Sequence, residues 1–444
     1  MNRDDMLALL EEKQFKELRE ILENTHPVDI AEFFEELEDK QILLLFRLLS
    51  KDQAAETFTE MNNEMCEVLI NALTDSELKE VWDEMYLDDA ADILEEMPAN
   101  VVKRLLSATD EDTRRQINAL LNYPEDSVGS IMTVEYIALQ KGMTVEDAIL
   151  KIRQIGLNKE TIYTCYVTER RKLIGAVSLR EILTTSDTQT IEEIMETNMI
   201  YVNTHDDREE AVNTIDKYGL MALPVVDKEM RMVGIVTVDD AMDVLQEETT
   251  EDINKMAGIV VPNEDTYFET TIWQHAKSRF PWLLFLMLSA TLSGLALGHF
   301  EAALVAMPVL NIFVPMLTGT GGNCGSQSST LMIRGLATDE IKLRDVFKVI
   351  SKELAVALIV GFMLAVVNGI RIMIMYQNFV LAFTLGITLI LTVVLAKTIG
   401  CVLPLVAKKC GLDPALMAAP LITTLVDTGT ILIYLSFASK VFGL

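Results

Sequence analysis

Residues 420–435 read PLITTLVDTGTILIYL, an apolar run near the end of the chain whose one charged residue is Asp427. If this run lies in hydrocarbon, an ionised carboxylate near its centre costs at least ~2.5 kcal/mol. Some feature of the surrounding protein must therefore compensate the charge of Asp427. The rest of the chain indicates what that feature is.

The chain consists of two halves with different compositions. It has 444 residues and a formal net charge of −30. Residues 1–270 hold 60 of the 67 acidic residues and 25 of the 37 basic ones, whereas residues 271–444 hold only 7 acids and 12 bases. An acidic, water-soluble half of this size attracts cations and repels nucleic acid, so we expect no nucleic-acid partner.

Cysteine usage and the N-terminus give two further expectations. The five cysteines are scattered and form no CxxC pair, so we expect reduced thiols and no disulfide framework. The first residues, MNRDDMLALLEEK, lack the basic segment and apolar core of a signal peptide, so we expect none.

The second half predicts a membrane domain. Most of its apolar stretches reach the roughly 20 residues that a helix needs to cross a bilayer. We predict five transmembrane helices, at about 281–300, 302–336, 349–376, 379–407 and 412–438. The alternative is a large soluble core, but soluble helices rarely run so long with so few charges.

The basic residues predict the orientation of these spans, because loops on the cytoplasmic side are enriched in Lys and Arg. Bases precede the first span, follow the second and follow the fourth, whereas the other side holds only Arg371 and Lys440. We therefore expect a multi-pass protein of the cytoplasmic membrane, with the acidic half in the cytoplasm and the C-terminus outside.

The acidic half contains two kinds of repeat. Residues 1–128 are poor in Gly and Pro, and three similar amphipathic segments, at 27–37, 52–61 and 88–98, predict an all-α superhelical stack. Residues 129–190 and 191–252 are two copies of a small α/β unit, since IMTVEYIAL (131–139) matches IMETNMIYV (194–202). A second motif, Gly175…Ser178…Glu181, recurs as Gly234…Thr237…Asp240. At these residues the chain resembles a tandem cystathionine-β-synthase (CBS) pair, a module that senses small ligands such as adenine nucleotides.

Polar residues in the second predicted span identify the candidate ion path. Residues 314–337 combine poor helix formers, such as Pro315 and Gly322, with polar residues that include Asn323 and Gln327. Such a segment is tolerated at membrane depth where it is buried in protein or lines water, and small residues also permit close helix contact. The available ligands are oxygen donors, which suit Mg²⁺ because it keeps several waters and takes one or two carboxylates. We therefore interpret Asp427 as facing a wet pore and a divalent cation. The alternative is a structural Asp bonded to Ser or Thr on a neighbouring span.

Acidic residues also gather on helix faces in the first half. In residues 239–253, Asp240, Asp243, Glu247 and Glu251 fall on one face at about 100° per residue. Asp88, Asp92 and Glu95 share a face in the same way. Like charges in this arrangement repel, and bound cations relieve the repulsion. A simple solvated surface is the alternative for either face.

The whole chain resembles the MgtE family of magnesium channels and transporters, most specifically in GTGGNCGSQSST (319–330) and PLITTLVDTG (420–429). The resemblance implies a helical N-domain (1–128), a CBS pair (129–190 and 191–252), a connecting plug helix (253–280) and a five-helix pore domain (281–444). It implies a homodimer in contact with membrane lipid, with the pore between subunits. Asp427 would be the pore aspartate and Asn323 would belong to the pore segment.

The resemblance also implies regulatory ligands. Asp88 and Asp92 would meet Asp207, Glu209 and Asp240 through Mg²⁺, which would close the pore at high cytosolic Mg²⁺. The remaining expected Mg²⁺ ligands lie near the plug helix and the last span, and are Asp243, Glu248, Glu251, Asp252 and Asp413. ATP would bind the first CBS unit at Tyr163, Arg180 and Glu181, where Glu181 replaces the family's usual Asp; Tyr163 as a core residue is the alternative.

We therefore expect a Mg²⁺-selective channel that is gated by cytosolic Mg²⁺. An ion-coupled carrier of Mg²⁺, Co²⁺ or Mn²⁺ and a membrane-tethered nucleotide sensor are the alternatives. We expect no enzyme, because the sequence shows no nucleophile–base pair and no phosphate-binding glycine loop.

Overall fold

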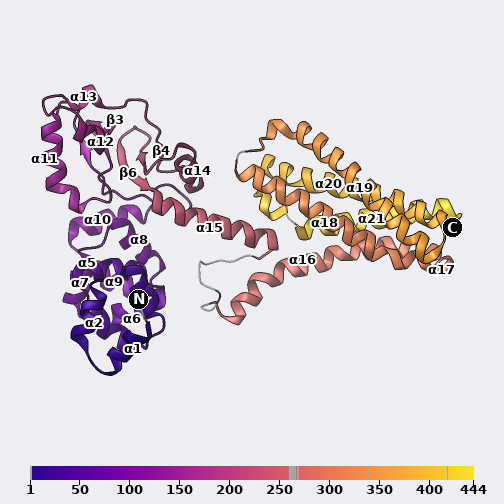
Figure 1. Cartoon of the computed structure of the whole chain (residues 1–444), viewed down its shortest axis with the longest axis horizontal. Coiled ribbons are helices and arrows are strands. Elements are labelled where there is room, and N and C mark those ends of the chain that lie inside the picture. Colours follow the sequence, from indigo (N-terminus) through magenta and orange to yellow (C-terminus); the bar gives the residue numbers. More distant parts are fainter. Residues whose placement is uncertain (1–2, 260–266, 268–269, 339, 418) are drawn as a thin grey trace. The chain divides into compact units, whose positions relative to one another are not determined.

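The computed structural model of the chain describes residues 3–259, 267, 270–338, 340–417 and 419–444. Its internal contacts divide it into two units, Met1–Leu245 and Gln246–Leu444. The first unit contains a stack of short helices and two small sheets, and the second contains long helices (Figure 1).

Short helices separated by capped breaks form residues 3–120. The side chains of Ser50, Asn62, Thr74 and Asp110 each accept a hydrogen bond from a backbone N–H in the first turn of the following helix, an interaction worth about 1 kcal/mol. Most helices of this segment pack on the helix two positions along the chain, as α3 does on α5 and α5 on α7. The predicted all-α superhelical N-domain is therefore confirmed. Its helices are α1 (Arg3–Glu11), α2 (Phe15–Leu22), α3 (Pro27–Phe34), α4 (Asp39–Phe46), α5 (Lys51–Thr59), α6 (Asn63–Ala72), α7 (Asp75–Trp82), α8 (Leu87–Glu96), α9 (Ala99–Ala108) and α10 (Glu111–Leu120).

Two similar three-stranded sheets follow, which confirms the predicted α/β pair. Each sheet joins a short parallel strand to an antiparallel pair, in the orders β1-β2-β3 and β4-β5-β6. The first copy contains β1 (Ala138–Leu139), α11 (Val145–Ile155), η1 (Gly156–Asn158), β2 (Thr164–Glu169), β3 (Lys172–Ser178), α12 (Leu179–Thr184) and α13 (Ile191–Ile194). The second contains β4 (Val202–Asn203), α14 (Arg208–Tyr218), β5 (Ala222–Val226), β6 (Met232–Thr237) and α15 (Val238–Ala257).

The two copies exchange their leading segments. Thr133, from the first IMT motif, forms an isolated β-bridge with Ile235 of the second sheet, and Glu196, from the second motif, bridges Ala176 of the first sheet. Gly234 is required at this contact because a Cβ there would lie 2.6 Å from the carbonyl oxygen of Thr133. The duplicated glycine of each signature therefore provides room for the other copy's leading segment.

One apolar core joins the helical stack to the second sheet. It runs without interruption from Leu18 and Phe34 through Leu94 to Val225 and Val236. Burial of this apolar surface stabilises the contact of α8 and its neighbours with the second copy. The acidic residues on α8 and α15 are thereby brought to one place.

Five long helices and the short helix α17 make up most of the described part of the second unit. They are α16 (Ile272–His299), α17 (Glu301–Ala306), α18 (Val309–Ala337), α19 (Val346–Tyr376), α20 (Phe379–Lys409) and α21 (Ala419–Phe442), with the short turns η2 (Leu343–Asp345) and η3 (Pro414–Met417). The plug helix expected at 253–280 is divided between the end of α15 and the start of α16, and residues 260–266 and 268–269 lie outside the described residues.

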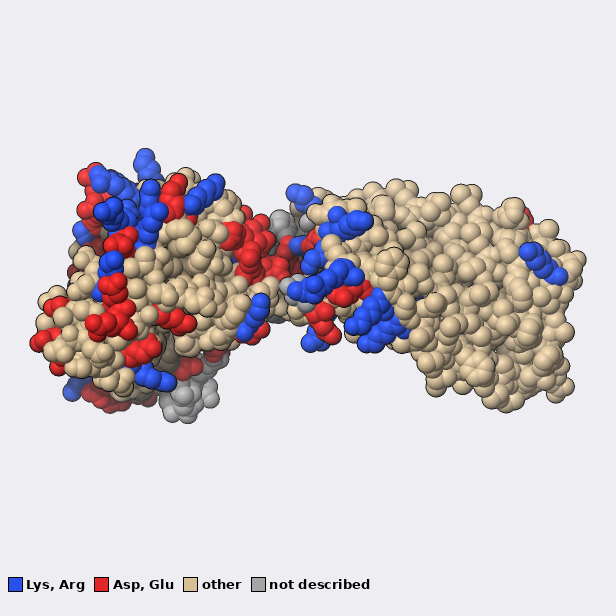
Figure 2. Space-filling view, turned by 90° about the horizontal axis from the view of Figure 1, so that it is seen from above, with Lys and Arg blue, Asp and Glu red and all other residues tan. Residues whose placement is uncertain are grey.

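Among the described residues, four helices are long and apolar enough to cross a membrane: Ile272–His299, Leu343–Tyr376, Phe379–Lys409 and Pro420–Phe442. α18 is of similar length, with 29 residues, but contains the glycine-rich polar segment, so its crossing and the count of five stay a prediction. Figure 2 shows few charges along most of the bundle, with most of its Lys and Arg, together with some Asp and Glu, at one end. Lys408, near the end of α20, lies beside the end of α18, because its ammonium donates a hydrogen bond of 2.9 Å to the Leu336 carbonyl.

Glycines allow α18 to pack closely against α20 and α21. A Cβ on Gly321 would lie 2.8 Å from side-chain atoms of both Thr392 and Val426. A Cβ on Gly400 of α20 would collide with the carbonyl oxygen of Gly325. Close helix contact therefore accounts for several glycines of the 314–337 segment, and α18 stays helical through all of it.

Candidate functional site

Carboxylates from four separate segments converge where α8 meets the pair of α/β units. Asp88 lies on α8 and Asp240 on α15, whereas Glu135 and Glu160 come from connecting segments of the first copy. Asp88 is only 9% exposed. One carboxylate oxygen each of Asp88, Glu135 and Glu160 is buried with no hydrogen-bond partner among the described residues. Buried acceptors without donors are costly, so this group is suited to a cation or to protons.

The pKa values of this cluster are raised, and each shift has a physical cause. Burial, followed by the charge of Asp89, raises the pKa of Asp88 to about 7. Burial and the charge of Asp88 raise the pKa of Asp240 to about 7 and that of Glu160 to about 8. Desolvation together with Asp88 raises the pKa of Asp92 to about 8, although part of that side chain is open to solvent. Near neutral pH the cluster therefore exchanges protons and can exchange them for a cation.

Asp207 and Glu209 occupy the exposed start of α14. Asp207 caps that helix by accepting a hydrogen bond of 2.9 Å from the backbone N–H of Glu209. Asp207 also forms a β-bridge with Ser127 in the segment that follows α10. These two acids therefore lie beside the joint between the helical stack and the pair of α/β units.

The remaining expected acids lie along α15 and just before η3. In the second unit, the Lys255 ammonium lies 2.7 Å from Glu251 and 2.8 Å from Asp413, which stands just before η3. Burial and the charge of Asp413 raise the pKa of Asp252. Burial and Asp239 likewise raise the pKa of Asp243 on the preceding part of the helix. Glu251 and Asp413 are thus bridged by a lysine in this structure, where we had expected Mg²⁺.

A metal ion has no complete protein cage here. Among the described residues, no three His, Cys, Asp or Glu side chains are arranged to hold one. A cation that joins these surfaces would therefore need water in its shell, which is usual for Mg²⁺.

Polar side chains form an exposed stripe along α18. Asn323 and Gln327 are exposed, and they recur at helical spacing with Thr330 and Arg334. Most of their neighbours on the other faces, such as Cys324 and Ser328, are buried. The stripe therefore faces away from the packed interior of this chain.

Asp427 lies near the middle of α21, which packs on α18. Its Oδ1 is buried and has no hydrogen-bond partner among the described residues. The nearby Thr428 hydroxyl is already paired with the Ser293 hydroxyl at 2.8 Å. A structural hydrogen bond to Oδ1 from a neighbouring Ser or Thr is therefore absent from the described part of the chain.

The expected nucleotide residues meet at the start of α12. The backbone N–H of Leu179 donates to the Tyr163 carbonyl at 2.9 Å, which places Tyr163 beside Arg180 and Glu181. Tyr163 is 65% exposed, so it is not a core residue. The Glu181 carboxylate already accepts hydrogen bonds of 3.0 Å from the Ser178 backbone N–H and hydroxyl.

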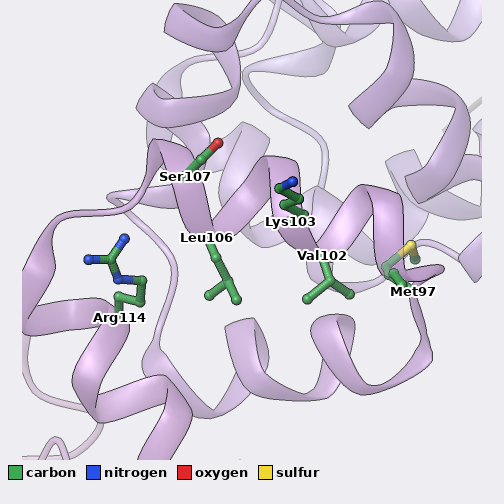
Figure 3. Close-up of a pocket in the computed structure, with 7 residues that line it drawn as sticks. Met97, Val102, Lys103, Leu106, Ser107 and Arg114 are labelled. Carbon is green, nitrogen blue, oxygen red and sulfur yellow. The ribbon is translucent and has the colours of Figure 1, made fainter.

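The N-domain also has a surface hollow of about 580 Å³ between α9 and α10. Lys103 and Arg114 lie at its rim and Val102 and Leu106 form its apolar wall (Figure 3). The charged residues that line it, among the side chains that the structure describes, are the bases Lys103 and Arg114.

Comparisons with known proteins cover nearly the whole chain. The model of a divalent cation transporter family, MgtE, matches residues 314–437, that of the MgtE intracellular N domain matches 25–126, and that of the CBS domain matches 128–187 and 191–247. The chain is 39% identical over 437 residues to the magnesium transporter MgtE of Thermus thermophilus, covering 97% of this chain and 96% of that protein. The chain belongs to the MgtE family.

Other MgtE relatives agree with this assignment. The magnesium transporter MgtE of Bacillus subtilis is 31% identical, covering 98% of this chain and 96% of that protein. The cytosolic domain of the Mg²⁺ channel MgtE, solved in complex with ATP, is 37% identical with a TM-score of 0.52, and the match covers 55% of this chain and 99% of that one. The family and fold class predicted from the sequence are thereby confirmed.

Several polar residues of this MgtE chain were missed by sequence reasoning. Glu135 and Glu160 lie outside any acidic helix face, so no periodic signal marks them. Lys255 lies among the acidic residues of α15, and its spacing does not distinguish it from a solvent-exposed lysine. Glu353 and Lys397 had a clear signal, because each is a charge inside a predicted span.

Proposed function

We propose that the chain imports Mg²⁺ across the cytoplasmic membrane through a pore formed by two copies. Its family membership supports this proposal, since relatives that match it over nearly their full length are named magnesium transporters. In this proposal α16, α18, α19, α20 and α21 are the five spans, the N-terminal domains are cytoplasmic and the C-terminus is outside. The gathering of Lys and Arg at one end of the bundle supports this orientation (Figure 2).

The observation that carries the proposal is Asp427. Its carboxylate sits within a long apolar helix, and Oδ1 has no hydrogen-bond partner among the described residues. An ionised carboxylate at that depth requires water or a cation. A pore that holds a hydrated Mg²⁺ supplies both, and needs only one or two carboxylates.

The exposed stripe on α18 supports a homodimer. Asn323 and Gln327 would face lipid if a single chain crossed the membrane alone, which is unfavourable for amide side chains. Two copies that turn these stripes toward each other would shield them from lipid and enclose a wet path. Asn323 would then lie beside the same path as Asp427.

The acidic surfaces support gating by cytosolic Mg²⁺. Asp88 and Asp240 are packed together, with the exposed Asp92 beside them, at a cost in ionisation that bound cations would offset. High Mg²⁺ would stabilise this packing, and low Mg²⁺ would favour separation of the surfaces and an open pore. The other proposed regulatory ligands are Asp207, Glu209, Asp243, Glu248, Glu251, Asp252 and Asp413.

ATP is a proposed second regulator. Tyr163 and Arg180 offer an exposed aromatic ring and a cation beside Glu181. A homologous cytosolic domain was solved in complex with ATP. Since the Glu181 carboxylate already caps α12, ribose binding would have to compete with that cap.

The test is ion flux into proteoliposomes that contain the purified protein. We expect Mg²⁺ uptake that follows its gradient, without proton movement, and that is inhibited when Mg²⁺ is raised on the side of the acidic domains. Uptake that requires a proton or sodium gradient would instead identify a coupled carrier. Absence of flux with Mg²⁺, Co²⁺ or Mn²⁺ would leave only the nucleotide-sensor alternative.

A further inference from the structure

Three polar side chains from three helices meet inside the bundle. Glu353 of α19 and Lys397 of α20 are 9% and 6% exposed, and Ser328 of α18 is fully buried. Lys397 Nζ lies 3.3 Å from Glu353 Oε2 and donates a hydrogen bond of 3.0 Å to the Ser328 hydroxyl. That hydroxyl in turn donates one of 2.7 Å to Glu353 Oε2. The three contacts form a closed ring.

Stability alone does not explain a buried ion pair. Removing two charges from water costs about as much as their attraction returns, and an apolar pair of similar volume is often equally stable. Charged hydrogen bonds differ from apolar contacts because they are directional. The ring therefore holds its three helices in one relative arrangement that apolar packing would not specify.

The ring holds α18 through a single group, the hydroxyl of Ser328. One turn before Ser328, Gly325 packs against Gly400 and the carbonyl oxygen of Ala396. That contact brings α18 close to α20, but smooth glycine surfaces do not by themselves fix the rotation of a helix. Successive residues of a helix are about 100° apart. A rotation by one residue would therefore replace Asn323 on the exposed stripe by Cys324.

We propose that Ser328, Glu353 and Lys397 are positioning residues that set the rotation of α18 and so present Asn323 and Gln327 on the exposed stripe. The ring lies one turn from Cys324 on the buried side of the helix, where Cys324 packs in a core with Ala357 and Val393. Any consequence for ion selectivity rests on the proposed function; the rotation of α18 does not.

Two native cysteines provide the readout. Cys324 on α18 is 7% exposed and Cys401 on α20 is fully buried. A rotation of α18 would expose Cys324 and leave Cys401 protected, whereas general loosening would expose both. The full chain is labelled with N-ethylmaleimide in detergent, and peptide mass spectrometry measures the rate at each cysteine.

The main variant is Glu353→Met with Lys397→Met, which removes both charges and leaves no unpaired ion. We expect the dimer to form, Cys401 to stay protected and Cys324 to be labelled about tenfold faster, the effect of losing one hydrogen bond to a charged group. The matched control is Ser351→Ala on α19, which removes an exposed hydroxyl bonded only to its own helix.

A second variant keeps the test decisive if the double variant does not fold. Ser328→Ala removes only the hydroxyl and leaves the ion pair, so it should also speed labelling of Cys324. Wild-type protection of Cys324 in a folded variant, or equal exposure of Cys324 and Cys401, would overturn the proposal.

Flux measurements separate this proposal from the proposed function. If wild-type proteoliposomes import Mg²⁺, the double variant should admit more Ca²⁺ relative to Mg²⁺. Rotation of α18 would displace Asn323 and Gln327 from the ion path and so weaken selection between the two ions. Faster labelling of Cys324 with no wild-type flux would support the positioning role and reject the transport function. Unchanged labelling of Cys324 together with normal flux would reject the positioning role and support the transport function.

Discussion

Replacing Asp88 by Asn should strengthen the packing of the helical stack on the CBS pair when Mg²⁺ is absent. Asp88 is 9% exposed and its Oδ1 has no hydrogen-bond partner among the described residues. Burial and the charge of Asp89 raise its pKa from 3.8 to about 7. Since one pKa unit corresponds to about 1.4 kcal/mol, ionised Asp88 costs the packed state at most roughly 4 kcal/mol relative to a solvated carboxylate. Asn keeps the side-chain size and removes that cost.

The direction of the pH dependence follows from the raised pKa. The packed state binds more protons than the separated state, so packing is most favourable below the ordinary pKa of 3.8 and weakens as the pH rises toward about 7. Glu160, with its pKa raised to about 8, extends this loss to about pH 8. Asp88→Asn removes the contribution of Asp88 to this pH dependence of packing.

The assay is limited proteolysis of the full chain in detergent without divalent ions, at about pH 6 and about pH 8. The cleavage rate at residues 121–130, between the helical stack and the first sheet, reports separation. We expect faster cleavage of the wild type at the higher pH and slow cleavage of Asp88→Asn at both. Asp83→Asn, an exposed acid with the same charge change, is the matched control and should behave as wild type. Faster cleavage of Asp88→Asn than of wild type at about pH 8 would refute the reasoning.

Three further predictions concern other contacts. Lys255→Met removes the ammonium between Glu251 and Asp413, so Mg²⁺ should no longer compete with it. The Mg²⁺ concentration that half-closes the pore should fall by up to about fivefold, which corresponds to ~1 kcal/mol of lost pairing, whereas a rise would identify Lys255 as part of the closed-state lock. Gly400→Ala should lower the thermal unfolding midpoint in detergent, because the added Cβ collides with the Gly325 carbonyl and overpacking costs about 1–3 kcal/mol. Gly369→Ala is the control, since a Cβ at Gly369 meets no neighbouring helix within 4 Å and should leave the midpoint unchanged. Equal effects of the two substitutions would contradict the packing argument. Raising Mg²⁺ should slow wild-type cleavage at 121–130 more at about pH 8 than at about pH 6, because at the lower pH protons already neutralise part of the carboxylate cluster. An equal effect of Mg²⁺ at both pH values would contradict the competition of protons with Mg²⁺.

The sequence predicted the architecture well because its signals are periodic. The repeats at 27–37, 52–61 and 88–98 correspond to α3, α5 and α8, and the duplicated signatures at Gly175 and Gly234 correspond to matching strands. What periodicity could not show is the exchange of leading segments between the two copies. That exchange depends on a contact between residues about 100 positions apart, such as Thr133 and Ile235.

The candidate site was predictable only in part. Acids that share one helix face, such as Asp88 and Asp92, are visible in sequence, but Glu135 and Glu160 join them only through the fold. Lys255 shows the opposite limit, since no spacing rule predicts that a lysine will bridge Glu251 and Asp413. The roles of these residues in Mg²⁺ binding stay predictions.

Mg²⁺ flux through Asp427→Asn protein is the most direct test of transport along the α18 and α21 surface. Wild type, Asp427→Asn and Thr428→Val would be reconstituted at equal dimer density, and Mg²⁺ entry measured with an enclosed fluorescent indicator. Thr428→Val is the matched control, because the Thr428 hydroxyl is already engaged by Ser293 and lies beside Asp427 in the sequence. We predict near-complete loss of flux in Asp427→Asn and substantial flux in Thr428→Val. Wild-type flux through a dimeric, folded Asp427→Asn protein would contradict the proposal that this carboxylate holds the ion in the pore.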